Sequence, residues 1–256
     1  MKVIVAGERP FVQEVGQLCM DVGHDTILYL VEDFFSAIES GMMMDEASDA
    51  EVVVELYNEA ADAKQELLLG LGLAIPRAAL VLTSALATSA TEAAAWLPHP
   101  KRAVGFGVLP PLGPEGIVEL APALQTDASY LQRAERFWRE LGYEPVAVAD
   151  GPGLVRARVV CCLVNEAAGA LMEGIASAED IDQAMKLGTN YPYGPLEWAD
   201  ILGLDTVLGV MTGLFHEWGE DRYRPSPLLR RMVLAGRLGR KSGRGFYHYA
   251  GDEEEG

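Results

Sequence analysis

The sequence predicts an α/β fold, a Rossmann-like, doubly wound sheet domain followed by an all-α domain. Over residues 1–149, short β-branched runs alternate with amphipathic stretches, which is typical of a mostly parallel sheet covered by helices. Residues 150–203 instead show helices and turns without a strand. We therefore expect a sheet domain over 1–149 and a helical domain over 150–256.

The sheet domain opens with a strand, a helix and a second strand. Met1–Ala6 (MKVIVA) is apolar and β-branched, apolar residues at helical spacing follow up to Val22, and Thr26–Val31 is the second strand. Only one short helix fits between Asp33 and Asp49. Further strands are expected at 50–56, 79–83, 103–109, 116–121 and 145–149, with helices at 58–69 and 127–141.

Proline and glycine mark the start of the helical domain. Gly151-Pro152-Gly153 is expected to be a hinge. The helix expected over 154–172 is apolar on most sides, as a buried helix would be. Ser177 precedes two acids with the spacing of a helix cap, Gly188 is a natural stop, and Pro195 suits the first turn of the next helix.

The chain is strongly acidic. Its formal net charge of −18 and pI near 4.5 oppose binding to nucleic acid or to an anionic membrane, because both carry negative charge. Cys19, Cys161 and Cys162 lack metal-ligand spacing, so we expect buried, reduced thiols and no metal site. Without a signal peptide or long apolar span, we expect a cytoplasmic protein. Met42–Met44 are expected to fill core space, and GDEEEG at 251–256 to be a solvated tail.

The turn after the first strand departs from a dinucleotide-binding loop. Such a loop needs glycines so that the backbone can turn tightly and approach the pyrophosphate. Gly7 holds the first glycine position, but Arg9 and Val12 hold the second and third, and Pro10 removes an N–H donor. The acid expected to bind the ribose about 20 residues further on is replaced by Leu30, and Glu32 and Asp33 could substitute only if the strand ended later. NAD is therefore expected to bind weakly or not at all.

Three segments of the helical half carry a resemblance. AEDIDQAMKLGTNYPYGPLEWADILGLDT (178–206), preceded by DGPGLVRARVVCCLVNEA (150–167) and followed by RLGRKSGRGFYHY (237–249), is similar to the C-terminal domain of the 3-hydroxyacyl-CoA dehydrogenases. The similarity is close over this half and looser over the sheet half. It implies a two-domain, NAD-dependent enzyme that oxidises 3-hydroxyacyl-CoA to 3-oxoacyl-CoA. It also implies a homodimer, expected here through the helices around Val159–Met172 and Leu196–Leu214.

The resemblance implies where the catalytic groups of the family would fall. The histidine base falls on Gly107, the oxyanion-binding serine on Leu86 and the asparagine on Ala157, so that only the glutamate is retained, as Glu119. Losing a general base costs roughly 10²–10⁴ in rate, and losing an oxyanion donor about 10²–10³. Without its histidine, Glu119 could be bonded instead to backbone amides or to an arginine such as Arg156.

The cofactor positions of the family are also incomplete. Besides Gly7, the pair Glu59 and Lys64 matches an acid and a lysine that contact the cofactor in the family. From the residues alone we favour a solvated pair on a helix face. The family carries a helical hairpin that helps to hold CoA after the second strand, and the short stretch 33–49 has no room for it.

Three functions therefore remain open. The first is a degenerate, shortened family member that is catalytically impaired or silent and acts as a dimeric structural, regulatory or ligand-binding protein. The alternative is an active NAD-dependent 3-hydroxyacyl-CoA dehydrogenase with relocated groups, for which His99 is a candidate base. The third keeps the cleft for an acyl-CoA or another small ligand.

Overall fold

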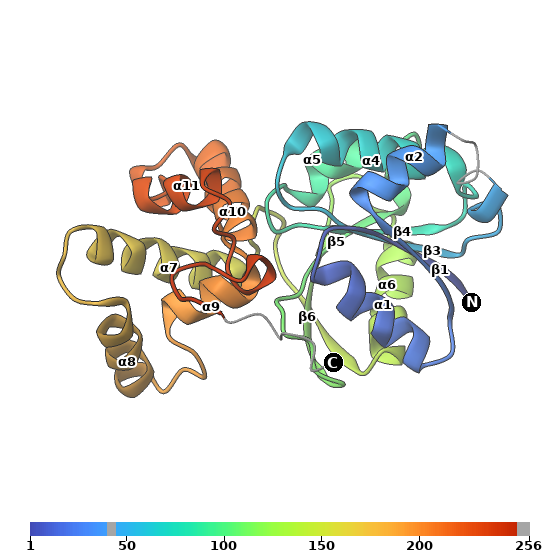
Figure 1. The fold of residues 1–256 in the computed structure, drawn as a ribbon. Helices are drawn as coiled ribbons and strands as arrows, with labels where there is room; N and C mark the ends of the chain where they lie inside the picture. Colours follow the sequence, from blue (N-terminus) through green and yellow to red (C-terminus); the bar gives the residue numbers. More distant parts are fainter. Residues whose placement is uncertain (40–44, 250–256) are drawn as a thin grey trace. The chain divides into compact units, whose positions relative to one another are not determined.

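The computed structural model describes residues 1–39 and 45–249. The chain divides into two compact units, a sheet unit (Met1–Ala157) and a helical unit (Arg158–Gly256), coloured from blue to yellow and from yellow to red in Figure 1. Residues 150–157, with which the sequence predicts the helical domain to open, belong to the sheet unit. Met42–Met44 and the acidic end lie outside the described residues.

The sheet unit contains a seven-stranded sheet in the order β2-β1-β3-β4-β5-β6-β7. The first five strands pair in parallel, β6 is antiparallel to β5, and β7 is parallel to β6. This confirms the Rossmann-like class. The strands are β1 (Lys2–Gly7), β2 (Asp25–Leu30), β3 (Val52–Leu56), β4 (Leu80–Ser84), β5 (Ala103–Gly107), β6 (Gly116–Pro122) and β7 (Tyr143–Ala147).

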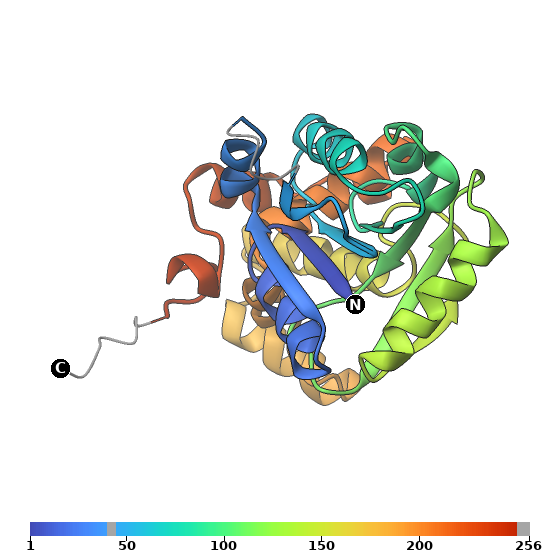
Figure 2. The ribbon, with the colours of Figure 1, turned by 90° about the vertical axis from the view of Figure 1, so that its right-hand side faces the viewer.

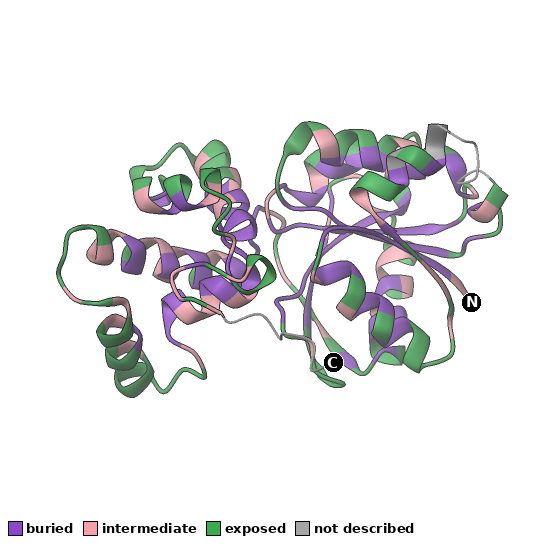
Figure 3. Cartoon of the chain, viewed as in Figure 1, coloured by how far each residue is buried: buried purple, intermediate pink, exposed green. Residues whose placement is uncertain are grey.

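Helices cover both faces of this sheet. In Figure 1, α2 (Val31–Glu39), α4 (Ala61–Ala74) and α5 (Ala90–Ala95) lie on one face, and α1 (Phe11–Asp21) and α6 (Ala128–Glu140) lie on the other. Figure 2 shows the same two layers after a quarter turn. Every residue of β3, β4 and β5 is buried, as the purple strands of Figure 3 show. Strands covered on both faces are continuous apolar runs, which explains segments such as VVVEL.

The strand order fixes where a ligand would bind. The chain passes from β2 on one side of β1 to β3 on the other, and ligands of such sheets bind where the order reverses, at the carboxyl ends of the strands. Gly7 ends β1 and Leu56 ends β3 at this point. On the other side, β2 is the edge strand, and α2 begins directly after it.

The helical unit consists of short helices around the longer α7 and α10. α8 begins after Ser177, whose hydroxyl accepts the N–H of Asp180 as predicted. It does not stop at Gly188, because Asn190 adopts the left-handed conformation (φ 57°) that ends it. The helices are α7 (Arg156–Met172), α8 (Ala178–Thr189), α9 (Pro195–Leu202), α10 (Leu204–Trp218) and α11 (Pro227–Leu234).

A buried carboxylate, Asp182, joins α8 to α9 and to the C-terminal segment. It accepts the backbone N–H groups of Leu196 (2.8 Å) and Glu197 (2.7 Å) and the hydroxyl of Tyr247 (2.7 Å). A side chain at Gly194 would overlap this carboxylate. The motif AED…YGPLE is therefore explained by the way α9 begins.

A second buried carboxylate, Asp200 of α9, holds the C-terminal segment itself. It accepts the N–H groups of Phe246 and Tyr247, both at 2.9 Å, and the hydroxyl of Tyr249 at 3.0 Å. Gly245 leaves the space that this carboxylate occupies. The motif GRGFYHY is thus required by the packing of the helical unit.

Within the described part of the chain, no single helix is long and apolar enough to cross a membrane. α9 and α10 together reach that length and composition, but they meet at a bend of 100°.

Candidate functional site

The structure brings the four positions implied by the family resemblance into one place in the sheet unit. Gly107 ends β5 and pairs with Glu119 on the antiparallel strand β6. A Cβ at position 107 would lie 3.4 Å from Glu119 Oε2 and 3.5 Å from Leu86 Cδ2. Ala157 is buried in the first turn of α7, next to the residue that contacts Glu119. The four positions are arranged as a site, but only one of them, Glu119, carries a polar side chain.

A leucine takes the space in front of Gly107. Leu154 Cδ1 would lie 2.9 Å from a Cβ at position 107, which is closer than such contacts normally are. Leu154 is buried, adopts the left-handed conformation (φ 47°) and packs against Ala85 and Ala121. The position of the family's base thus lies between two leucine side chains and the Glu119 carboxylate.

Glu119 is held by backbone. Its two carboxylate oxygens lie 3.1 and 3.3 Å from the N–H of Arg156, at the start of α7. Burial raises the pKa of Glu119, and the hydrogen bonds from this turn oppose the rise. The Arg156 guanidinium points elsewhere and donates to the carbonyl of Ile117 at 3.4 Å. Glu119 thus accepts a hydrogen bond from the backbone at the start of α7. This contact does not need a histidine.

The turn after β1 carries carboxylates where a dinucleotide needs donors. Gly7 is required, because a Cβ there would lie 2.5 Å from the Leu56 carbonyl group. The Glu8 N–H donates to that same carbonyl oxygen (3.3 Å), and the buried Glu8 carboxylate accepts the Asn58 side-chain amide (3.1 Å). Asn58 in turn accepts the Ser84 hydroxyl (2.6 Å). This chain of bonds connects the carboxyl ends of β1, β3 and β4.

A second carboxylate lies on the other side of the same turn. Glu14, in the first turn of α1, accepts the N–H of Leu112 from the loop after β5 (2.7 Å). Burial is the main cause of its raised pKa. Pyrophosphates bind to free N–H groups at a helix start. Here Glu8 precedes the start of α1 and Glu14 lies in its first turn, and the Val12 N–H already donates to the Glu8 carbonyl (3.0 Å).

The prediction of a solvated Glu59–Lys64 pair is wrong. Lys64 is buried, and its ammonium lies 2.6 Å from the Glu55 carboxylate and 2.8 Å from the Tyr57 carbonyl oxygen. Glu55 also accepts the Thr83 hydroxyl (2.6 Å). An ion pair with both partners buried needs such additional bonds to offset desolvation. The signal that identifies it in the sequence is an acid inside the apolar strand VVVEL, which needs a cation nearby.

The predicted hinge at Gly151-Pro152-Gly153 is instead anchored to the sheet unit. The Gly153 N–H donates to the Ala85 carbonyl (2.9 Å). The carboxylate of Asp150 accepts the N–H groups of Ala90 (2.7 Å) and Thr91 (2.8 Å) at the start of α5. The helix dipole favours such an anion at a helix N-terminus. Sequence patterns of proline and glycine could not show this tertiary contact.

No group of three or more potential ligands among His, Cys, Asp and Glu could hold a metal ion within residues 1–39 and 45–249. Cys19 and Cys161 are buried, whereas Cys162 is partly exposed.

Both halves of the chain match models of one family. Residues 153–249 match the 3-hydroxyacyl-CoA dehydrogenase C-terminal domain, and residues 24–151 match the NAD binding domain of the same enzymes. The second match leaves out β1, the turn at Gly7 and α1, the segment in which the phosphate-binding glycines are replaced.

Known proteins of this family are similar over most of the chain. A probable 3-hydroxybutyryl-CoA dehydrogenase of Bacillus subtilis is 37% identical over 86% of this chain and 76% of its own length. A probable 3-hydroxybutyryl-CoA dehydrogenase of Deinococcus radiodurans is 39% identical over 79% of this chain and 73% of its own length. The crystal structure of the (S)-3-hydroxybutyryl-CoA dehydrogenase of Ralstonia eutropha superposes with a TM-score of 0.77 at 30% identity, covering 97% of this chain and 99% of that chain. The chain thus belongs to the 3-hydroxyacyl-CoA dehydrogenase family.

Proposed function

We propose that this chain is a family member whose site no longer performs hydride transfer efficiently and that it acts as a dimeric structural, regulatory or small-ligand-binding protein. The observation that carries the proposal is the surroundings of Gly107. Alcohol oxidation needs a group to accept the hydroxyl proton and donors for the developing oxyanion. Gly107, Leu86 and Ala157 offer neither, and Leu154 fills the space beside them.

Relocation of the base within the sheet unit has no support from the fold. His99 precedes β5, whereas Gly107 ends it. The five residues of β5 are joined by four steps of about 3.3 Å, which separate its two ends by about 13 Å. His24 lies before β2, where its ring stacks on Phe137. Both histidines are thus at the amino edge of the sheet, opposite the site.

A second candidate is an active NAD-dependent 3-hydroxyacyl-CoA dehydrogenase. The comparisons by themselves favour it, because the relatives at 37% and 39% identity are named 3-hydroxybutyryl-CoA dehydrogenases. The retained Glu119 and the paired strands β5 and β6 are compatible with it. The residues at positions 86, 107 and 157 are our reason for placing it second.

Steady-state turnover separates the two candidates. Purified protein is mixed with acetoacetyl-CoA and NADH, the nicotinamide absorbance is followed, and the Ralstonia eutropha enzyme serves as positive control. We expect no rate above the protein-free reaction. Turnover within about tenfold of the ~10 s⁻¹ typical of enzymes would establish the second candidate, provided that Glu119→Gln reduces it. That variant excludes a contaminating enzyme as the source.

Ligand binding at the family site is a separate question. We infer from Glu8, Glu14 and Leu30 that NAD binds weakly or not at all, and binding of an acyl-CoA or another small ligand stays a prediction. Thermal shift against NAD and acetoacetyl-CoA tests this, because a ligand of the folded state raises the melting temperature. A clear shift with NAD alone would contradict the inference.

We also propose a homodimer through the helical unit. Of the two predicted stretches, Leu196–Leu214 has its apolar side chains buried within its own unit, and it offers little to a partner. α7 leaves Val159 and Met172 about half exposed, and Ile175 beyond it is 70% exposed. We therefore place the dimer contact on α7 and the residues that follow it. A cytoplasmic location, without nucleic acid or membrane partners, stays a prediction.

A further inference from the structure

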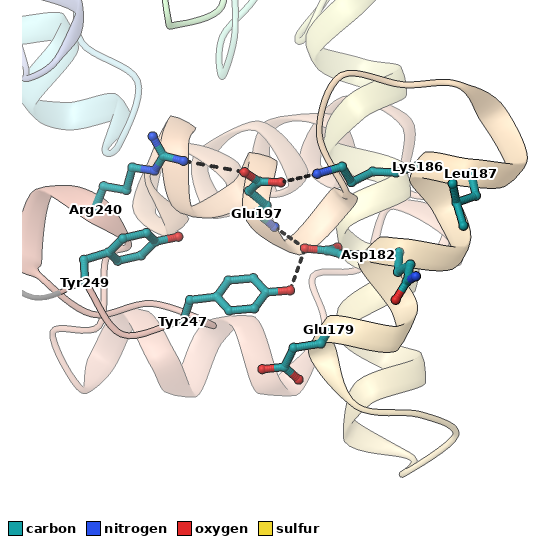
Figure 4. Close-up of a pocket in the computed structure, with 9 residues that line it drawn as sticks. Glu179, Asp182, Lys186, Leu187, Glu197, Arg240, Tyr247 and Tyr249 are labelled. Carbon is teal, nitrogen blue, oxygen red and sulfur yellow. Dashed lines mark hydrogen bonds and ion pairs between the residues drawn. The ribbon is translucent and has the colours of Figure 1, made fainter.

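The helical unit contains a cavity of about 470 Å³ outside the family site. It lies between α8, α9 and the C-terminal segment, and Figure 4 shows the side chains around it. The polar ones come from all three elements, so the cavity depends on the fold of the whole unit. Its lining includes Glu179, Gln183, Lys186, Glu197, Arg240, Tyr247 and Tyr249.

One end of the cavity has an excess of positive charge. Lys186 Nζ lies 3.3 Å from one oxygen of Glu197, and Arg240 Nη2 lies 3.7 Å from the other. Two cations thus share one carboxylate at distances longer than those of strong charged hydrogen bonds. Both cations are about half exposed. A second anion, and a phosphate in particular, can bind to them without displacing a tight ion pair.

Two tyrosine rings form one wall of the cavity. The Tyr247 hydroxyl donates to Asp182 (2.7 Å) and the Tyr249 hydroxyl to Asp200 (3.0 Å), so both rings are fixed at their polar ends. The Arg240 guanidinium lies over the Tyr249 ring at 5.5 Å. Fixed aromatic rings beside a cation are a surface on which a flat base stacks.

The other end of the cavity accepts hydrogen bonds. Glu179 has no hydrogen bond or ion pair to any other described residue, and Figure 4 shows its carboxylate beside Tyr247. It precedes Lys186 by seven positions on α8, which at 1.5 Å per residue is about 10 Å along the helix. Gln183 lies between them. The two ends can therefore bind a phosphate and an amine of one elongated ligand.

We propose that this cavity binds a nucleoside phosphate whose base carries an exocyclic amine, as adenine does. The phosphate lies on Lys186 and Arg240, the base lies against the tyrosine rings, and the amine donates to Glu179. A free adenine nucleotide and the adenosine 3′,5′-diphosphate end of CoA share this chemistry. The proposal does not depend on the catalytic state of the family site.

Isothermal titration with the full chain tests the proposal, using AMP, IMP, CoA and inorganic phosphate. We expect AMP to bind at least about tenfold more tightly than IMP, whose oxo group cannot donate to Glu179. Inorganic phosphate should bind more weakly than either. Tighter binding of CoA than of AMP identifies CoA as the source of the adenosine, and the reverse identifies a free nucleotide.

Variants assign the two ends of the ligand. Arg240→Gln and Lys186→Gln should each weaken AMP binding at least about tenfold, whereas Arg237→Gln, an exposed arginine outside the cavity, should leave it unchanged. Glu179→Gln should remove the preference for AMP over IMP. Absence of heat with AMP and CoA at millimolar concentration overturns the proposal, as does equal weakening by Arg240→Gln and Arg237→Gln.

Discussion

Gly107 lies where the family resemblance places the histidine base. Gly107 keeps the register with Glu119 that places a side chain toward the carboxylate. Leu154, however, already lies 2.9 Å from the first atom that such a side chain would add. A histidine therefore cannot be restored there without moving a buried leucine.

We expect Gly107→His to lower the free energy of unfolding by about 1–3 kcal/mol, the usual cost of overpacking a core, and to give no dehydrogenase activity. Urea denaturation and the NADH assay measure the two effects. Gly107→Ala is the matched control, because its methyl group meets only the flexible end of Leu154, and its stability should change far less. Equal stability of the histidine variant and the wild type would show that Leu154 does not close the site.

Glu119 has no histidine at position 107 as a hydrogen-bond partner, because that residue is a glycine. Since burial raises its pKa above the ordinary 4.5, the folded state binds the proton more tightly than the unfolded state. The contribution of Glu119 to stability is therefore fully present below the unfolded value and is lost as the pH rises through the folded value.

Glu119→Gln, which keeps an oxygen for the Arg156 N–H, should therefore raise the urea midpoint at pH 7 and have little effect at pH 4. Parallel urea titrations at the two pH values measure this. A loss of stability at pH 7 would instead mean that the carboxylate charge stabilises the start of α7.

At the scale of elements, β3 and α4 are joined by the Glu55–Lys64 pair. Lys64→Met leaves the Glu55 carboxylate buried with only Thr83 and the Tyr57 N–H as donors, and we expect a loss of about 3–5 kcal/mol in the free energy of unfolding. Lys2→Met is the matched control, because its partner Asp49 is largely exposed, and should change stability little. Similar losses in both variants would argue against a buried pair.

The C-terminal segment is likewise held to α9 by Asp200. Asp200→Ala removes the acceptor of two backbone N–H groups and one hydroxyl, which should cost on the order of 2–5 kcal/mol and open the segment 239–249 to protease. Limited proteolysis followed by mass spectrometry detects the cleavage. Asp221→Ala, at an exposed ion pair with Arg224, is the control and should leave the cleavage pattern unchanged.

The sequence predicts the elements better than it predicts their contacts. β-branched runs and capping residues identify the strands and most helix starts, because these depend on neighbours in the chain. The anchoring of Gly153 by Ala85, the burial of Lys64 and the role of Asp150 depend on residues distant in sequence. The four positions of the family site could be located from the resemblance, but the contact of Leu154 with position 107 joins residues 47 positions apart and depends on the fold.

At the scale of the whole molecule, the exposed apolar residues beside α7 predict self-association. Ile175→Asp should shift the protein from dimer toward monomer, because a charge in an apolar contact is costly to desolvate. Light scattering over a concentration series measures the mass. Leu124→Asp is the control, since Leu124 is 92% exposed in the sheet unit and should leave the dimer intact. A monomeric wild type would remove the dimer from the proposed function.

Asp182 and Asp200, with the glycines that make room for them, affect how a family assignment is interpreted. Their hydrogen bonds hold the helical unit together, and this packing does not use the residues at positions 86, 107 and 157. Similarity in the motifs AED…YGPLE and GRGFYHY indicates common ancestry. Whether the chain performs the chemistry depends instead on three separate positions, 86, 107 and 157.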